Sequence, residues 1–135
     1  MAEFHLQIVT PEGLKYDGEV ESIILRTVNG DVGILKNHIG YVTAIDAGKV
    51  KIKIDGKNKF GAASEGFIKV GKENTTLVCT TFEWAEDIDT ERAQRALDGA
   101  ESKLAQNPED KEVVKILKAR KKRAKVRLAV ATENK

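Results

Sequence analysis

The spacing of apolar residues changes once along this chain, near Asp89, and that change constrains the fold more than any other feature. Upstream, apolar and polar residues alternate over short stretches, which is typical of β-strands with one buried face. The clearest apolar sets are Phe4, Leu6 and Ile8, and Val50, Ile52 and Ile54. Downstream, apolar residues recur every three or four positions, as in amphipathic helices. We therefore expect an α+β protein, with a β domain over residues 1–84 and a helical domain over residues 85–135.

The β domain is expected to be antiparallel. Further strands are predicted at residues 22–28, 67–70 and 76–82, and glycine-containing turns separate them. Asp55-Gly56 supplies a hairpin signal after one of the alternating stretches. No helix-length segment lies between these strands, as a parallel α/β sheet would require. Many short strands joined by turns favour an antiparallel sandwich or barrel.

The tail is expected to form an antiparallel hairpin of two helices. Asp89 is a good N-cap for the first helix, and Ile88 and Ala93 are spaced to act as a hydrophobic staple. Asn107-Pro108 ends this helix, and the second helix begins near Glu109. The apolar stripe of the first helix is Ala93, Leu97, Ala100 and Leu104, and that of the second is Val113, Val114, Ile116, Leu117, Ala124, Leu128 and Ala131. Such narrow stripes bury little area, so we expect the hairpin to dock on the sandwich or on a partner.

Composition argues against catalysis by this chain alone. Its single cysteine and two histidines cannot form a metal site of ordinary spacing, and nothing marks a nucleophilic triad. Residues 66–72 have the spacing of a phosphate-binding loop, but Glu73 stands where Ser or Thr must hold magnesium. No apolar run approaches the ~20 residues that span a bilayer, and no signal peptide is recognisable. We expect a non-enzymatic, soluble chain without a metal site or a membrane-inserted segment.

Basic charge is concentrated in the second helix, where eight Lys and Arg residues fall within residues 115–127. A solvated helix face is the simplest interpretation. A nucleic-acid surface would need aromatic or amide side chains for base contact, and this helix offers none. A membrane surface would need bulky apolar anchors opposite the charge, which are also missing. The helix is therefore expected to bind neither nucleic acid nor lipid.

A further interpretation follows from folding the hairpin about its Asn-Pro break. This pairs Arg92 with Arg123 and Arg95 with Arg120. Guanidiniums this close repel, so they either splay into water or hold a polyanion between them with their forked donors. Asp89 could then take a sugar hydroxyl, and Glu83 lies just upstream. The sequence thus allows a hairpin that a nucleotide closes, beside the simpler possibility of a solvated face.

Several short motifs together resemble the epsilon subunit of bacterial F-type ATP synthases over essentially the whole chain. They are Thr10-Pro11-Glu12-Gly13, Gly30-Asp31-Val32-Gly33-Ile34-Leu35, His38, Ser64-Glu65-Gly66-Phe67 and Ile88-Asp89-Thr90-Glu91-Arg92-Ala93. The last motif is similar to the family's ATP-binding signature. The resemblance implies a β-sandwich of about ten strands followed by a two-helix C-terminal domain.

The resemblance also implies a non-catalytic subunit of the central stalk, bound to the gamma subunit and resting on the c-subunit ring. Asp31 and His38 would lie at this contact. As a peripheral part of the F1 sector, the chain would lie at the cytoplasmic face of the membrane. It would couple the rotor to the alpha/beta head and restrain ATP hydrolysis. Its helices would either fold onto the sandwich, a state that ATP favours as a regulatory ligand, or extend into the head.

Carried over by motif, the expected ATP-binding residues are Glu83, Ile88, Asp89, Arg92, Ala93, Arg123 and Arg127. Gly99 departs from the pattern, because some ATP-binding members carry a basic residue there. The alternative is a purely structural rotor subunit whose basic helix regulates without binding ATP. In that case Asp89 is only an N-cap.

Overall fold

The computed structural model describes residues 3–27, 30–35, 40–72 and 74–133. It has ten strands, one 3-10 turn and two long helices. The strands are β1 (Phe4–Thr10), β2 (Gly13–Val20), β3 (Ser22–Thr27), β4 (Gly30–Leu35), β5 (Tyr41–Ile45), β6 (Gly48–Ile54), β7 (Lys57–Ala63), β8 (Gly66–Val70), β9 (Asn74–Cys79) and β10 (Phe82–Trp84). The turn η1 (Ala85–Asp87) leads into α1 (Thr90–Ala105) and α2 (Lys111–Glu133).

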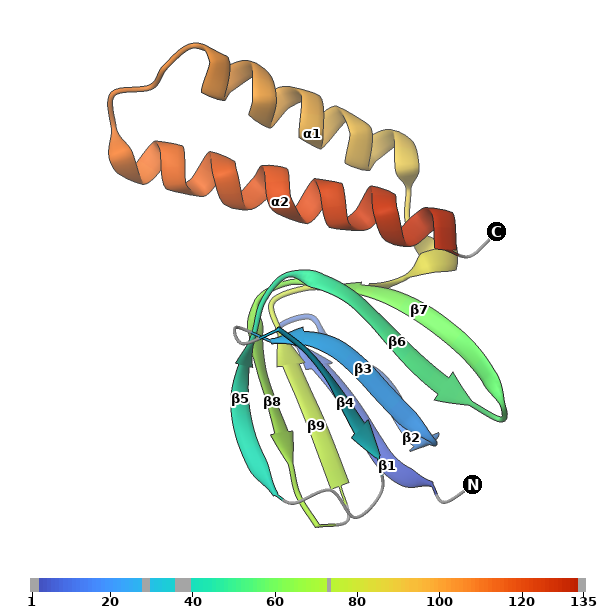
Figure 1. Cartoon of the computed structure of the whole chain (residues 1–135). Helices are drawn as coiled ribbons and strands as arrows, with labels where there is room; N and C mark the ends of the chain where they lie inside the picture. The colour runs from blue at the N-terminus through green and yellow to red at the C-terminus, as the bar shows by residue number, and fades with distance from the viewer. Residues whose placement is uncertain (1–2, 28–29, 36–39, 73, 134–135) are drawn as a thin grey trace.

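The strands form a strongly curved sandwich beneath the helical hairpin (Figure 1). Their order is β10-β7-β6-β3-β5-β8-β9-β1-β2, and β4 pairs with β3. Every pairing is antiparallel except that of β1 with β9, which is parallel. The predicted sandwich of about ten strands followed by two helices is confirmed.

The strand predicted over residues 76–82 is in fact two strands, β9 and β10. The break lies at Thr80 and Thr81, where the chain leaves β8 and joins β7. Thr81 donates its N–H to the Ser64 hydroxyl oxygen at 2.7 Å, and its carbonyl accepts the Ser64 N–H at 3.0 Å. The apolar spacing alone could not reveal this change of partner.

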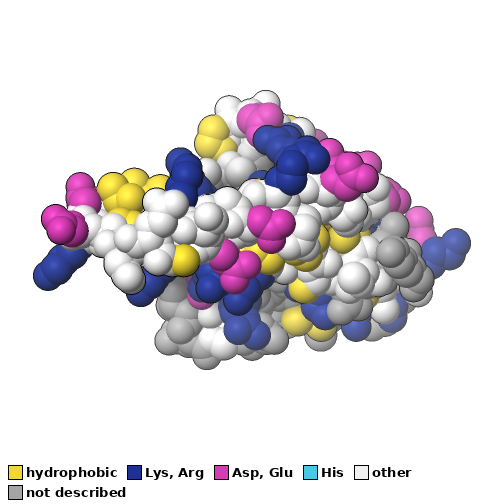
Figure 2. Space-filling view, turned by 90° about the horizontal axis from the view of Figure 1, so that it is seen from above, with side chains coloured by type: hydrophobic (Ala, Val, Ile, Leu, Met, Phe, Trp, Pro, Cys, Tyr) yellow, Lys and Arg dark blue, Asp and Glu magenta, His cyan; other side chains and the backbone are white. Residues whose placement is uncertain are grey.

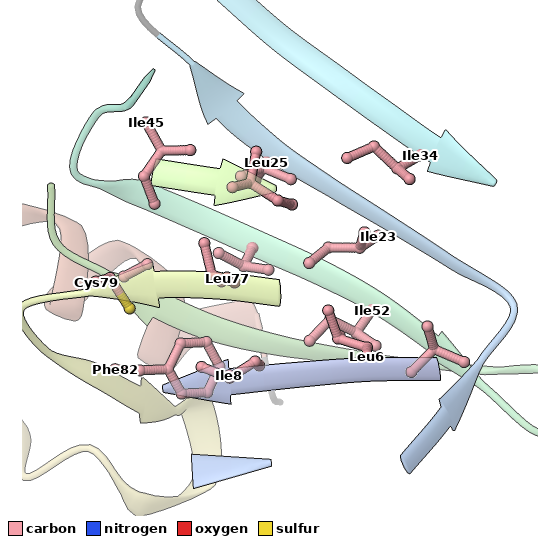
Figure 3. Close-up of a cluster of buried hydrophobic side chains, with 14 of the residues drawn as sticks. Leu6, Ile8, Ile23, Leu25, Ile34, Ile45, Ile52, Leu77, Cys79 and Phe82 are labelled. Carbon is pink, nitrogen blue, oxygen red and sulfur yellow. The ribbon is translucent and has the colours of Figure 1, made fainter. Parts of the chain in front are cut away.

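The main core lies inside the sandwich and contains the alternating residues predicted from the sequence (Figure 3). Leu6 and Ile8 of β1 are fully buried, whereas His5 and Gln7 between them are only half-buried. Cys79 is also buried in this core, and desolvation raises the pKa of its thiol to about 11. The core thus fixes which face of each strand is turned outward.

Gly66 lets two strands of the sandwich approach closely. A Cβ atom at this position would lie 2.0 Å from the backbone carbonyl oxygen of Val78 and 2.7 Å from the Cα of Cys79. These are backbone atoms that cannot rotate away. Gly66 is therefore required by the packing of β8 on β9.

The helices begin and end where the sequence predicted. The Asp89 carboxylate accepts the backbone N–H of Arg92 at 3.0 Å, so Asp89 is the N-cap of α1. Asn107, in the connection between the helices, has a left-handed φ of 51°. In α2, Leu117, Ala124 and Ala131 are buried as expected.

Two residues of the expected α2 stripe are exposed. Val113 is 41% exposed and Ile116 is 51% exposed. Both lie near the connected end of the hairpin, which projects beyond the sandwich (Figure 1). The sandwich therefore covers only the later part of the stripe.

Helix α2 lies between α1 and the sandwich (Figure 1). Val130 is fully buried in a small second cluster with Ala62 of β7 and Ala85 of η1. Phe60, Ile88 and Val126 pack against this cluster and are partly buried. The hairpin therefore docks on the sandwich through a few apolar side chains.

Candidate functional site

A cavity of about 340 Å³ lies where the sandwich, the start of α1 and the later part of α2 meet. Its lining residues come from three distant parts of the chain: Glu12, Lys15, Thr81, Phe82, Glu83, Asp89, Arg92, Ala93 and Arg127. Three of these side chains are cationic and three are anionic. The cavity can therefore offer both hydrogen-bond acceptors and donors to one ligand.

Arg127 connects α2 to the sandwich at this cavity. Its Nε donates a hydrogen bond to a Glu83 carboxylate oxygen at 2.5 Å, and the two side chains are 29% and 34% exposed. Asp89 contributes from the N-cap of α1, while Ala93 is buried one turn into the helix. The cavity is thus assembled only when the hairpin is docked.

A groove of about 280 Å³ runs between α1 and α2 and shares Arg127 with this cavity. Its charged lining residues are all cationic: Lys103, Arg120, Arg123 and Arg127. Gly99 also lines it, and a Cβ atom there would meet nothing within 4 Å. The groove is consequently more favourable to an anion than the mixed-charge cavity beside it.

Acidic residues of the sandwich pair with further basic residues of α2. Lys122 donates to Asp46 at 2.5 Å, and Arg123 lies 3.6 Å from a Glu65 carboxylate oxygen. The hydrogen bond from Lys122 holds the pKa of Asp46 below its usual value. The basic helix is therefore partly neutralised by the sandwich, a contribution that comes from outside the hairpin.

The arginines of the hairpin line two neighbouring hollows rather than one. Arg92 shares the cavity with Arg127, whereas Arg123 and Arg120 line the groove. The connection also covers residues 106–110 rather than a two-residue turn. Seen from above, basic and acidic side chains are interspersed over the hairpin (Figure 2).

The structure brings five of the seven expected ATP-binding residues together in the cavity: Glu83, Asp89, Arg92, Ala93 and Arg127. Arg123 lies in the adjoining groove. Ile88 is partly buried against the docking cluster and does not line the cavity. Of the two expected stalk-contact residues, Asp31 lies on β4 with its backbone paired to Arg26, and His38 lies outside the described residues.

Sequence reasoning missed two charged residues of the cavity, Glu12 and Lys15. In the sequence, Glu12 stands out only as part of the turn motif Thr10-Pro11-Glu12-Gly13. Nothing in the local spacing indicates that the β1–β2 turn lies beside the start of α1.

Within the described residues, no group of His, Cys, Asp and Glu side chains is arranged to hold a metal ion. No helix in these parts of the chain combines the length and apolarity needed to cross a bilayer.

Comparison with known proteins identifies the family. Residues 3–85 match the family described as ATP synthase, Delta/Epsilon chain, beta-sandwich domain, and residues 86–132 match its long alpha-helix domain. The chain is 42% identical to the ATP synthase epsilon chain of Caldanaerobacter subterraneus subsp. tengcongensis over 131 residues, or 96% of this chain and 94% of that one. It is 39% identical to the epsilon chain of Caldicellulosiruptor bescii over 135 residues, or 100% of this chain and 98% of that one.

The fold also resembles that of a chain in the Euglena gracilis mitochondrial ATP synthase structure that contains OSCP, F1 and the c-ring. The TM-score is 0.71 at 22% identity, and the match covers 99% of this chain and 81% of that one. The two domain families that match this chain and the relatives of nearly equal length all describe subunits of ATP synthase. This chain belongs to the ATP synthase epsilon chain family.

Proposed function

We propose that this protein is a non-catalytic subunit of the ATP synthase central stalk whose helical hairpin responds to ATP. Its partners would be the gamma subunit, the c-subunit ring and, with the helices extended, the alpha/beta head. It would work at the cytoplasmic face of the membrane as a peripheral part of F1. Family membership supports this role, as does the likeness in fold to chains of solved ATP synthase stalk and c-ring assemblies.

The observation that carries the ATP-responsive part is the meeting of five of the expected ATP-binding residues in one cavity beside a cationic groove. Carboxylates such as Glu83 and Asp89 can accept hydrogen bonds from ribose hydroxyls or an exocyclic amine. Guanidiniums bind phosphate oxygens through paired donors. We assign the nucleoside to the mixed-charge cavity and the phosphates to the groove, with Arg127 between them.

ATP bound in this way would hold α1, α2 and the sandwich together. Arg92 belongs to α1, Arg127 to α2 and Glu83 to the sandwich, so one ligand would contact all three parts. A ligand shifts an equilibrium only through its different affinity for the two states. Because the cavity exists only in the docked form, ATP at 100 times its dissociation constant would stabilise that form by about 2.7 kcal/mol. Release of ATP would allow the hairpin to extend and inhibit hydrolysis.

Calorimetric titration of ATP into the full-length chain tests the binding site. Arg92→Ala and Arg127→Ala should each weaken binding by about tenfold or more, since each removes a charge-assisted hydrogen bond worth roughly 1.5–3 kcal/mol. Lys125→Ala is the matched control, because Lys125 is exposed on α2 and lines neither the cavity nor the groove. Absence of binding at millimolar ATP, or equal weakening by the control, would refute the site.

Gly99 gives a second test with opposite effects on stability and binding. Gly99→Arg adds a guanidinium to the cationic groove, so without ATP it should be less stable than Gly99→Ala, and it should raise the affinity for ATP. Gly99→Ala should stabilise α1 by about 1 kcal/mol and leave the affinity unchanged. Equal affinities for the arginine and alanine variants would argue against phosphate binding in the groove.

The alternative function, a structural rotor subunit that regulates without ATP, also has an observation in its favour. Glu83, Glu65 and Asp46 already neutralise part of α2, so the hairpin can dock without a ligand. Both proposals predict that removal of the hairpin speeds ATP hydrolysis by the assembled enzyme. Only the ATP-responsive proposal predicts that inhibition by the intact chain weakens as the ATP concentration rises.

A further inference from the structure

A further cavity, of about 590 Å³, lies between α2 and two strands of the sandwich, β3 and β6. It is larger than the cavity and the groove assigned to ATP, and it shares no lining residue with either of them. Its volume falls in the range of roughly 300–1,000 Å³ that is usual for small-molecule sites. We call it the β3–α2 cavity.

The lining of the β3–α2 cavity combines positive charge with apolar surface. Its charged side chains are all cationic: Arg26, Lys49, Lys51 and Lys122. Its other side chains are apolar, among them Ile24 of β3 and Val126 and Ala129 of α2. Among the described residues that line it, no side chain is a hydrogen-bond acceptor and none is aromatic.

This lining distinguishes between two kinds of anion. A second nucleotide would find no side chain to accept hydrogen bonds from its ribose hydroxyls or its exocyclic amine, and no ring on which its base could stack. A carboxylate attached to an alkyl chain needs only donors at one end and apolar contacts along the rest. The cavity therefore favours an amphiphilic anion.

Lys51 is the cation to which we assign the anionic group. Its side chain is half-buried on β6, and its backbone pairs with Ile24 of β3. Within the part of the chain that the structure describes, no carboxylate forms an ion pair with Lys51. Lys122, by contrast, already donates to Asp46 at 2.5 Å. An anion therefore gains more at Lys51 than at Lys122, where the Asp46 carboxylate would repel it.

Docking of α2 leaves the apolar side chains of the cavity in partial contact with solvent. Ile24 is 39% exposed, Ala129 is exposed and Val126 is only partly buried. An alkyl chain between β3 and α2 would cover all three. Each methylene that it buries raises the affinity by about fourfold.

We propose that the β3–α2 cavity binds the carboxylate form of a free fatty acid, with the carboxylate at Lys51 and the alkyl chain between Ile24 and α2. One ligand then contacts both the sandwich and the hairpin, so it stabilises the docked form. Because this cavity shares no lining residue with the ATP site, ATP and the fatty acid can bind together. Each tightens the binding of the other, since both select the docked form. The binding site is independent of the proposed function, on which only the resulting relief of inhibition rests.

Calorimetric titration of dodecanoate, below its micelle concentration, into the full-length chain tests the site. Binding should have a stoichiometry of one, and Lys51→Gln should raise the dissociation constant by about tenfold. Lys53→Gln is the matched control, because Lys53 is half-buried on the same face of β6 but does not line the cavity. It should change the dissociation constant by less than about twofold. Ala129→Trp places an indole in the space for the alkyl chain and should weaken binding by about tenfold or more. Ala129 is exposed on α2, so this variant remains informative if Lys51→Gln disturbs the sheet.

Related ligands test the chemistry of the site. Decanoate should bind roughly 15-fold more weakly than dodecanoate, because it buries two fewer methylene groups. Dodecyltrimethylammonium has the same tail with a positive head group and should not bind. Vesicles of phosphatidylglycerol distinguish a free fatty acid from the surface of an anionic membrane, and they should not bind the chain either.

Trypsin cleavage after Lys125 tests the preference for the docked form, since Lys125 is exposed on α2 and does not line the cavity. Dodecanoate at ten times its dissociation constant should slow this cleavage by about tenfold in the wild type and not at all in Ala129→Trp. Unchanged cleavage of the wild type would overturn the coupling to docking.

The site itself would be overturned by absence of binding at millimolar dodecanoate, or by equal affinities of the wild type, Lys51→Gln and Ala129→Trp. Equal binding of the ammonium compound, equal affinities for decanoate and dodecanoate, or binding to the vesicles would overturn it as well. Failure of the chain to bind ATP would refute the proposed ATP response and leave this inference standing.

Discussion

Val130 should contribute more to docking of the hairpin than any single ion pair. Its side chain is 0% exposed and packs with Ala62 and Ala85. Val130→Ala removes two methyl groups, each worth about 0.8 kcal/mol of burial, and leaves a small cavity, which together cost roughly 2 kcal/mol. Since about 1.4 kcal/mol corresponds to tenfold, the docking equilibrium should shift by roughly 30-fold. The partly exposed ion pairs of α2 should contribute only about 0.2–1 kcal/mol each.

Trypsin susceptibility provides the assay, because α2 carries eight Lys and Arg residues over residues 115–127. When opening and closing are fast compared with cleavage, the cleavage rate follows the open population. Val130→Ala should therefore be cleaved in α2 about 30-fold faster than wild type. Val113→Ala changes an exposed residue of the same helix and should differ from wild type by less than about threefold. Equal acceleration by both variants, or none by Val130→Ala, would refute the docking argument.

Three further predictions concern charge and backbone packing. Asp46→Asn should cost up to about 1 kcal/mol at neutral pH by removing the pair with Lys122. Because this pairing lowers the pKa of Asp46, the contribution is present above pH 3.8 and is lost as the pH falls through the folded-state pKa. Urea unfolding of both proteins from pH 7 to pH 2 should show their difference disappearing. Hydrogen bonds to Glu19 and a second carboxylate raise the pKa of His5 above 6.5, so their stabilisation is present below pH 6.5 and lost as the pH rises through the folded-state pKa. Glu19→Gln should lower the NMR titration midpoint of His5, and an unchanged midpoint would contradict this assignment. Gly66→Ala should destabilise the sandwich by more than about 3 kcal/mol in thermal unfolding, because its methyl carbon would lie 2.0 Å from a carbonyl oxygen of β9.

Local signals in the sequence were sufficient to predict the fold class. Alternation in β1 marked Leu6 and Ile8 as core, and Asp89 was recognisable as an N-cap from its position before a helical pattern. These features depend on residues close together in the chain. The division between β9 and β10 was not predictable in this way, because it depends on contacts between Ser64 and Thr81.

The electrostatics of the candidate site were predicted only in part. The motif identified residues that meet in the cavity, including Glu83 and Arg92. The carboxylates that neutralise α2, Glu65 and Asp46, lie far from it in sequence and came into contact only through docking. Which arginine shares the cavity with Arg92 also depends on tertiary packing, and the structure places Arg127 there and Arg123 in the adjoining groove. The charges of the tail alone predict neither the carboxylates that pair with α2 nor the arginine that shares the cavity with Arg92.

The parallel pairing of β1 with β9 affects how a newly synthesised chain can fold. His5 pairs with Asn74, so β1 acquires this neighbour only after synthesis has passed through nearly the whole sandwich. At about 5–20 residues per second this delay lasts roughly 3–14 s. During that interval β1 can pair with β2 but presents its other edge to chaperones or to a second nascent chain. Synthesis of the tail follows this closure, so the hairpin emerges beside an already formed docking surface.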